Sequence, residues 1–321
     1  TSLPFNRIQL KDDGSVDFDW MNKSWTYKDG ALESKRPSAD SRDRSVSISP
    51  DGNWKAYVRN FNLFVEDLET GEEIQLSYDG KKDYEYASFW GWSDMVLGEN
   101  GERPEHLSIN WSPDSKKIQT QIVDLRLAEK MLLLDNSQDD KFRPQLMGYY
   151  RASPGDTTVV MYTPVLFELE NKKETKFPSL SLPHFIGMYF NWDSENLYET
   201  YLQRGFKSFD LLEINADSKE IRKVYSESSP THINNDNIFR RLENGQFILG
   251  TEKSGWNQLY LMDWKTGNLV NRITSGDYVV KNLLSIDEEN SIIYFEASGK
   301  EEKVNPYYSF VYKVNCSCVV L

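Results

Sequence analysis

Short segments of alternating hydrophobic and polar residues, separated by turn residues, recur along most of this chain of 321 residues. The clearest example is residues 45–76, where four such segments are joined by tight turns, the first of them Ser49-Pro50-Asp51-Gly52. Alternation with a period of two is typical of β-strands, and Ser, Pro, Asp and Gly favour turns. Four short strands within about 35 residues have the size of one blade of a β-propeller.

The same pattern returns four more times with variations, and a partial version lies near residues 18–27. Each unit can bury a face of its sheet only against a neighbouring unit, so we expect a closed or stacked array and not independent domains. The sequence therefore predicts an all-β chain: a β-propeller of four-stranded antiparallel blades, about five to six of them recognisable, in a complete or incomplete ring. The further units begin near residues 109, 189, 247 and 285.

The spacing between the first two units is too long for a single blade. The turn at Ser49 and its repeat at Ser112 are 63 residues apart, so we interpret roughly residues 79–104 as an insertion. Residues 122–131 fit either a strand or one to two turns of helix, and their alternating flanks favour the strand.

Charge and cysteine content disfavour several classes of protein. The chain has 37 basic and 50 acidic residues and a net charge of −13, with no cluster of Lys and Arg, which disfavours a nucleic-acid partner. No apolar run approaches the roughly 18 residues that span a bilayer, so we expect no membrane span. Cys316 and Cys318 have no nearby histidine with which to close a zinc site, and we expect neither a metal nor a cofactor.

A more specific set of residues occupies the last third of the chain. Three motifs follow one another there: Ser254-Gly255-Trp256-Asn257-Gln258, Ile273-Thr274-Ser275-Gly276-Asp277-Tyr278, and Ile293-Tyr294-Phe295 with Asn305-Pro306-Tyr307-Tyr308. Together with the unit at residues 49–71 they resemble the N-terminal β-propeller of the dipeptidyl peptidase IV family, over nearly the whole chain and not after Asn315. The resemblance implies a propeller domain over residues 1–315 and a tail outside the family at residues 316–321.

The resemblance also implies a function that is shared with a second domain. Members of this family carry the propeller ahead of an α/β-hydrolase domain with a Ser-Asp-His triad, and the full-length enzymes release N-terminal di- or tripeptides. No Gly-x-Ser-x-Gly elbow surrounds any serine here, and His106, His184 and His232 have no recognisable triad context. We therefore expect no catalytic residue in this chain. It is interpreted as the substrate-gating propeller of a periplasmic or secreted serine exopeptidase, with the catalytic domain missing.

One substrate-binding position follows from the resemblance. The family places a carboxylate that binds the substrate's amino group just ahead of a Trp-Ser-Pro strand. Here an acidic segment precedes Trp111-Ser112-Pro113, which makes Glu102, and after it Glu99, the candidates. A carboxylate that faces an ammonium group makes a charge-assisted hydrogen bond. The family's two glutamates are adjacent and these are not, so a solvated acidic loop is the alternative.

Aromatic residues gather at the start of the same insertion. They could line a ligand funnel, or they could pack between blades, which is the default for large aromatic side chains. The residues are Tyr84, Tyr86, Phe89, Trp90 and Trp92.

The expected partners are the N-terminus of a peptide substrate and an α/β-hydrolase catalytic domain. A ring that lacks a blade would expose strand edges, which favours a homodimer. The alternative function is a free-standing propeller that binds a protein or a ligand as a scaffold, since a fold alone does not fix a function.

Overall fold

The computed structural model describes residues 6–11, 13–20, 23–35, 44–88, 107–136, 142–183, 190–234 and 238–315. Strands predominate in these ranges, where the one helical element is the short 3-10 helix η2 at Pro178–Leu180. None of the helical structure in the described ranges is long and apolar enough to cross a membrane.

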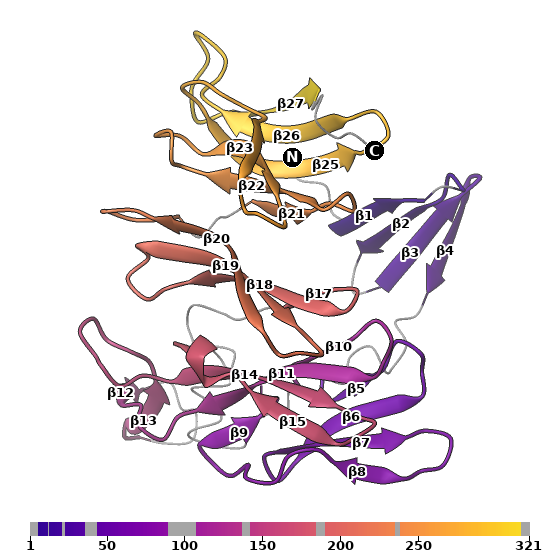
Figure 1. Ribbon diagram of the computed structural model, residues 1–321, viewed down its shortest axis with the longest axis vertical. Coiled ribbons are helices and arrows are strands. Elements are labelled where there is room, and N and C mark those ends of the chain that lie inside the picture. Colours follow the sequence, from indigo (N-terminus) through magenta and orange to yellow (C-terminus); the bar gives the residue numbers. More distant parts are fainter. Residues whose placement is uncertain are drawn as a thin grey trace.

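Six antiparallel sheets follow one another along the chain and are arranged as a six-bladed β-propeller (Figure 1). We number the blades in chain order. Blade 1 consists of β1 (Asn6–Leu10), β2 (Val16–Trp20), β3 (Lys23–Lys28) and β4 (Ala31–Lys35), and blade 2 of β5 (Val46–Ile48), β6 (Trp54–Arg59), β7 (Asn62–Asp67) and β8 (Glu73–Gln75).

Blade 3 is larger than its neighbours, because two short strands and a hairpin are added to its four-stranded path. Its sheet contains β9 (Tyr84–Tyr86), β10 (Ile109–Trp111), β11 (Lys117–Asp124), β14 (Met161–Glu168), β15 (Lys173–Lys176) and β16 (Leu182–Pro183). The hairpin between β11 and β14 consists of β12 (Lys130–Asp135) and β13 (Gln145–Tyr150).

The remaining blades keep the simple order of strands. Blade 4 consists of β17 (Asn191–Asp193), β18 (Asn196–Leu202), β19 (Ser208–Asn215) and β20 (Ile221–Ser228), and blade 5 of β21 (Phe239–Arg241), β22 (Gln246–Thr251), β23 (Gln258–Asp263) and β24 (Leu269–Arg272). In blade 6 the described strands are β25 (Val279–Asp287), β26 (Ile292–Ser298) and β27 (Ser309–Asn315).

The Ser-Pro-Asp turns are built by the same hydrogen bonds in blades 2 and 3. The Ser49 hydroxyl donates to Asp51 (2.6 Å) and accepts from the backbone N–H of Trp54 (2.9 Å). In blade 3 the Ser112 hydroxyl donates to Asp114 (2.6 Å) and accepts from the N–H of Lys117 (2.8 Å). Each turn therefore satisfies its own polar groups, which is why a short local sequence is enough to specify it.

Hydrophobic clusters lie between blades, because alternate residues of one strand point to opposite faces of its sheet. In β14 of blade 3, Val165 and Phe167 pack in a cluster with Leu63 of blade 2. Leu166 between them belongs to a cluster that includes Leu197 of blade 4. Similar clusters join blades 4 and 5, and blades 5 and 6.

The strand pattern confirms the predicted fold class and refines three predictions. The partial unit near residues 18–27 is part of a complete four-stranded sheet, blade 1. Residues 122–131 contain the end of β11, a turn and the start of β12, so the strand interpretation is correct for residues 122–124. The insertion was expected to begin near Asp79, but β9 still pairs with β11 at residues 84–86.

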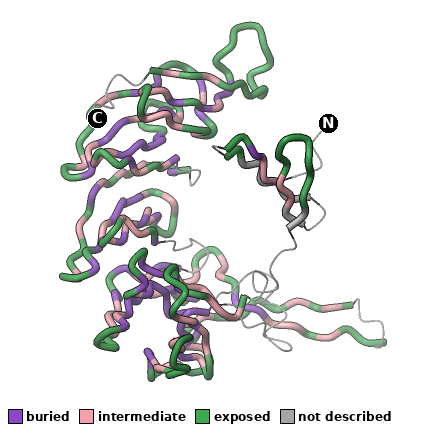
Figure 2. Tube along the Cα trace, turned by 90° about the vertical axis from the view of Figure 1, so that its right-hand side faces the viewer, coloured by how far each residue is buried: buried purple, intermediate pink, exposed green. Residues whose placement is uncertain are grey.

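The β12–β13 hairpin extends away from the blades (Figure 2). Leu132 pairs with Gly148 and Leu134 with Leu146, so the three leucines share one face of the hairpin. The exposed fractions of these side chains are 63% for Leu132, 61% for Leu134 and 59% for Leu146.

Two leucine substitutions test whether the clusters between blades stabilise the array. Leu261 is fully buried between blades 5 and 6, and Leu261→Ala should lower the free energy of unfolding by about 2–5 kcal/mol. The matched change Leu132→Ala on the exposed hairpin should alter it by less than about 0.5 kcal/mol. Urea denaturation followed by tryptophan fluorescence measures both. Equal effects of the two changes would contradict the assignment of the core.

Candidate functional site

The predicted substrate-binding residues Glu102 and Glu99 lie outside the described residues, as do Phe89, Trp90 and Trp92 of the aromatic group. The described strands show where their segment leaves the sheet and returns to it. Both β9 and β10 pair with β11, at successive positions: Tyr86 is opposite Ile122, and Ile109 is opposite Thr120. The two short strands are therefore two halves of one edge strand, with the segment inserted between them.

Hydrogen bonds join the end of β9 to the start of β10. Ser88 and Leu107 form an antiparallel bridge, and the N–H of Ser108 donates to the carbonyl of Ala87 (2.7 Å). The Gln121 side chain of β11 donates to the Ser108 hydroxyl (3.0 Å). Ser88 and Leu107, the described residues on either side of the insertion, therefore lie side by side on the edge of blade 3. First strands such as β5, β10 and β17 lie toward the middle of the molecule, and last strands such as β8 and β20 lie toward its outside (Figure 1).

A polar cluster around the buried Tyr86 supports the strand just before the insertion. Tyr86 has no exposed surface, and its hydroxyl lies 2.5 Å from Asp79 and 2.7 Å from Glu174. The Lys176 ammonium lies 2.8 Å from Asp79 and 3.3 Å from Glu174, so it offsets the charge of the two carboxylates. Burial, followed by the hydrogen bonds to these carboxylates, raises the pKa of Tyr86, and the phenol remains a donor.

The same cluster keeps Asp79 ionised. Burial acts to raise the pKa of Asp79, but the hydrogen bonds from Lys176 and Tyr86 outweigh it and hold that pKa below its usual range. Of the five aromatic residues in the group, the structure describes Tyr84 and Tyr86. Tyr86 packs against Phe167 in the core (6.1 Å between ring centroids), and Arg126 lies over the ring of Tyr84 (4.3 Å). Because the cluster of Tyr86 also contains Leu63 of blade 2, packing between blades, the default interpretation, is correct for Tyr86.

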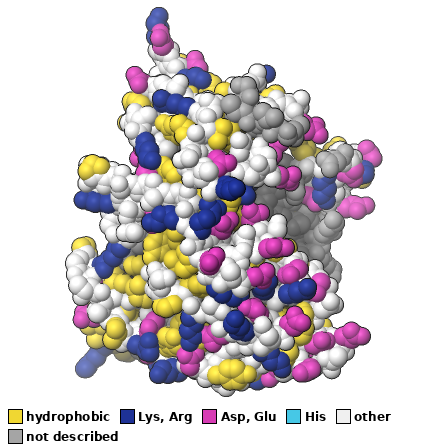
Figure 3. All heavy atoms as spheres, in the orientation of Figure 1, with side chains coloured by type: hydrophobic (Ala, Val, Ile, Leu, Met, Phe, Trp, Pro, Cys, Tyr) yellow, Lys and Arg dark blue, Asp and Glu magenta, His cyan; other side chains and the backbone are white. Residues whose placement is uncertain are grey.

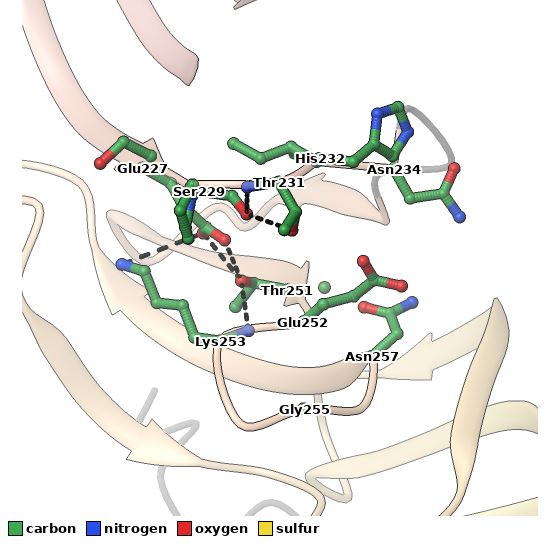
Figure 4. Close-up of a pocket in the computed structure, with 14 residues that line it drawn as sticks. Glu227, Ser229, Thr231, His232, Asn234, Thr251, Glu252, Lys253, Gly255 and Asn257 are labelled. Atoms are coloured by element: carbon green, nitrogen blue, oxygen red, sulfur yellow. Dashed lines mark hydrogen bonds and ion pairs between the residues drawn. The ribbon is translucent and has the colours of Figure 1, made fainter. Parts of the chain in front are cut away.

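A polar pocket of about 370 Å³ lies at the boundary of blades 4 and 5 (Figure 4). We call it the crossover pocket, because one wall consists of residues 227–234, which are the end of β20 and the crossover that leads to β21. The other wall is the β22–β23 turn at Gly250–Asn257. The sequence analysis missed this site: no motif marks it, and its residues meet only when the two blades pack together.

Glu227 lines the crossover pocket, and neighbouring side chains already bind its carboxylate. Its side chain is only 9% exposed and accepts hydrogen bonds from the hydroxyls of Thr251 (2.7 Å) and Tyr225 (2.9 Å). The Lys253 ammonium completes the group at 3.9 Å. Burial and the nearby Glu227 carboxylate raise the pKa of Tyr225, so its hydroxyl remains a hydrogen-bond donor. This carboxylate holds the β22–β23 turn against blade 4.

No catalytic triad is formed by the part of the chain that the structure describes. His232 is the only histidine in the described ranges, and its ring lies 5.6 Å from that of Phe206, without a hydrogen bond to a serine. The described residues also contain no group of three or more His, Cys, Asp or Glu that could hold a metal ion. Acidic and basic side chains are interspersed over the face seen in Figure 3.

The Tyr86 hydroxyl can be tested by removing it. Tyr86→Phe removes the hydroxyl that the exposed Asp79 and the partly buried Glu174 share, and water can replace it only in part, so the free energy of unfolding should fall by about 0.5–1.5 kcal/mol. The control Tyr294→Phe removes a hydroxyl from a more exposed residue of β26 and should change stability by less than about 0.5 kcal/mol. Urea denaturation at neutral pH measures both. A Tyr86→Phe protein as stable as the control would show that the cluster does not support β9.

The family model that matches this chain is the dipeptidyl peptidase IV (DPP IV) N-terminal region, over residues 18–318. Among solved structures, dipeptidyl peptidase 4 of Porphyromonas gingivalis is similar, with a TM-score of 0.63 and 17% sequence identity over 97% of this chain. A protein of Bacteroides ovatus described as a dipeptidyl aminopeptidase IV is similar with a TM-score of 0.58 and 16% identity over 96% of this chain. This chain spans 42% and 44% of the lengths of those two proteins.

At these identities the similar structures show a shared fold. The family model goes further, because it matches nearly all of the chain and agrees with the order of motifs in the sequence. The chain belongs to the dipeptidyl peptidase IV N-terminal region family.

Proposed function

We propose that this chain is the non-catalytic propeller of a dipeptidyl-peptidase-IV-like serine exopeptidase and that it gates access of peptides to an α/β-hydrolase domain. The proposal rests on family membership and on the absence of a triad in the described residues. The two similar structures are those of a dipeptidyl peptidase 4 and of a protein described as a dipeptidyl aminopeptidase IV. This similarity favours release of N-terminal dipeptides as the activity of the parent enzyme. A periplasmic or secreted location is part of the same proposal.

The interrupted edge strand is the observation that carries the gating role. The first strand of blade 3 is interrupted between Ser88 and Leu107, and first strands lie toward the middle of the propeller. Glu102 and Glu99 belong to the segment between these two residues. In the proposed mechanism their carboxylates pair with the α-ammonium group of the substrate, so that only a peptide with a free N-terminus is positioned for cleavage. The hydrolase domain supplies the nucleophile, the base and the oxyanion hole.

Turnover by the full-length gene product tests this proposal. We expect cleavage of alanyl-prolyl-p-nitroanilide, and much slower cleavage of its Nα-acetylated form, which has no ammonium group. Glu102→Gln should lower kcat/KM for the free substrate by about tenfold to a hundredfold, because one charge-assisted hydrogen bond contributes about 1.5–3 kcal/mol. Glu69→Gln, in the turn after β7, should leave kcat/KM unchanged.

Two results would overturn the proposal. One is equal cleavage of the free and the acetylated substrate, which would remove the role of the N-terminal ammonium group. The other is turnover by residues 1–321 alone that a serine-directed inhibitor abolishes, because the chain would then contain its own nucleophile.

We also propose that the chain forms a homodimer through the β12–β13 hairpin. The hairpin stands away from the blades and exposes Leu132, Leu134 and Leu146 on one face, and exposed apolar patches of this kind are typical of interaction sites.

Analytical ultracentrifugation at about 10 µM chain tests the dimer. The double variant Leu134→Lys with Leu146→Lys should sediment as a monomer, and the unmodified chain as a dimer. Leu269→Lys changes an equally exposed leucine on β24 of blade 5 and should leave the dimer intact. A monomeric unmodified chain would contradict this proposal without affecting the gating role.

A further inference from the structure

The crossover pocket is continuous with a second and wider cavity. This inner pocket has a volume of about 780 Å³ and lies between β21 of blade 5 and β25 of blade 6. The two cavities share three lining residues, Asn234, Glu252 and Asn257. They therefore form one groove that runs across the start of blade 5. Each cavity falls within the roughly 300–1,000 Å³ that is usual for small-molecule sites.

A free carboxylate stands at the shared wall of the groove. Glu252 is exposed, and within the described ranges its side chain makes no hydrogen bond or ion pair. Glu227 nearby differs, because Thr251, Tyr225 and Lys253 already bind it. Of the two acidic side chains in the crossover pocket, Glu252 is therefore the one with an uncompensated charge.

Asn257 provides a fixed acceptor beside this carboxylate. Its side-chain N–H donates to the carbonyl of Val280 (2.8 Å), and its own backbone carbonyl accepts from the N–H of Val280 (3.0 Å). Because the nitrogen is engaged with β25, Oδ1 is left as an acceptor in the groove. Figure 4 shows Glu252 and Asn257 side by side, pointing to the same side of the turn. A carboxylate and an amide oxygen together suit the three donors of an ammonium group.

Two basic residues line the other end of the groove. In β21, Arg241 points toward blade 4, where it pairs with Asp193 (3.1 Å), so Arg240 points the opposite way, toward blade 6. Arg240 is exposed and has no ion pair in the part of the chain that is described.

The second basic residue, Lys281, lies on β25. It is the extra residue of a β-bulge between Val280 and Asn282, an irregularity that redirects side chains. The Glu296 carboxylate interacts electrostatically with Lys281 and already accepts a hydrogen bond from the side chain of Asn282 (2.7 Å).

We propose that this groove binds short peptides with two free termini: Glu252 and Asn257 hold the α-ammonium group, and Arg240 with Lys281 holds the α-carboxylate. A zwitterion matches a groove that is negative at one wall and positive at the other, and each contact is a charge-assisted hydrogen bond. The choice of ligand rests on the proposed function, since peptides released by an exopeptidase carry both free termini. The four residues of the proposed site belong to blades 5 and 6 and to the β22–β23 turn, whereas Glu102 and Glu99 belong to the segment of the sequence inserted in blade 3.

Binding to the 321-residue chain tests the groove without any catalysis. The probes are alanyl-alanine, its Nα-acetyl derivative and its C-terminal amide, titrated into uniformly ¹⁵N-labelled chain and followed by NMR. We expect alanyl-alanine to shift the amide signals of Gly250, Gly255 and Asn257, and to leave Gly71 in blade 2 unshifted. Acetylation and amidation should each weaken binding about tenfold or more.

Charge-removing variants assign the two ends of the groove. Glu252→Gln should abolish discrimination between the free and the acetylated peptide, and Arg240→Gln should abolish discrimination between the acid and the amide. Glu289→Gln, in the turn after β25 and outside both cavities, should bind all three probes as the unmodified chain does. The unchanged signals of distant blades serve as the check that each variant is folded.

Three outcomes would overturn the proposal: no shift at millimolar alanyl-alanine, equal binding of the three probes, or unchanged discrimination in both variants. Failure here would leave the turnover experiments on Glu102 unaffected, because those measure cleavage by the parent enzyme. Conversely, a parent enzyme that ignores the substrate's N-terminus would contradict the gating role even if the groove binds dipeptides.

Discussion

The packing of neighbouring sheets against one another, from blade 2 to blade 6, is the constraint on which the rest of this structure depends. A propeller blade has two apolar faces, and alternation along β14 shows how both are buried: Val165 and Phe167 face blade 2, whereas Leu166 faces blade 4. The same arrangement occurs in blade 5, where Ile248 packs toward blade 6 and Phe247 toward blade 4. None of blades 2 to 6 therefore has a core of its own, and these blades are stable only as an array.

Local features of the fold could be predicted because their physical causes are local. The turn at Ser49 needs only a hydroxyl, a carboxylate and a backbone N–H within five residues, and it reappears at Ser112 with the same bonds. Alternation of apolar residues likewise predicted the strands of blades 2 to 6. The joining of β9 and β10 into one edge strand was not predictable, because it depends on the pairing of β9 with β11, which begins beyond the whole insertion.

The candidate sites also differ in whether the sequence alone could point to them. The family resemblance made Glu102 and Glu99 candidates because they precede Trp111-Ser112-Pro113, and this stays a prediction, since the described strands locate only the two ends of their segment. Nothing in the sequence distinguishes Glu227 from Glu252, since both are glutamates near short turns. The difference arises when the crossover from blade 4 meets the β22–β23 turn, which brings Thr251 and Lys253 to Glu227 and leaves Glu252 unpaired.

The boundaries between blades also explain why a groove in this position can be rigid enough to recognise charge. Two backbone hydrogen bonds hold the crossover: the N–H of Ser229 donates to the carbonyl of Lys207, and the N–H of Ile233 donates to the carbonyl of Phe206. The opposite turn is tied to β25 through Asn257, and Gly250 is closely packed there, since a methyl group on it would lie 2.9 Å from Cβ of Ile238. Both walls are therefore ordered by folding itself, so a ligand does not have to order them. The Glu252 carboxylate and the Arg240 guanidinium, which have no ion pair among the described residues, are then charges on ordered walls, and that is the condition under which weak ionic contacts become selective.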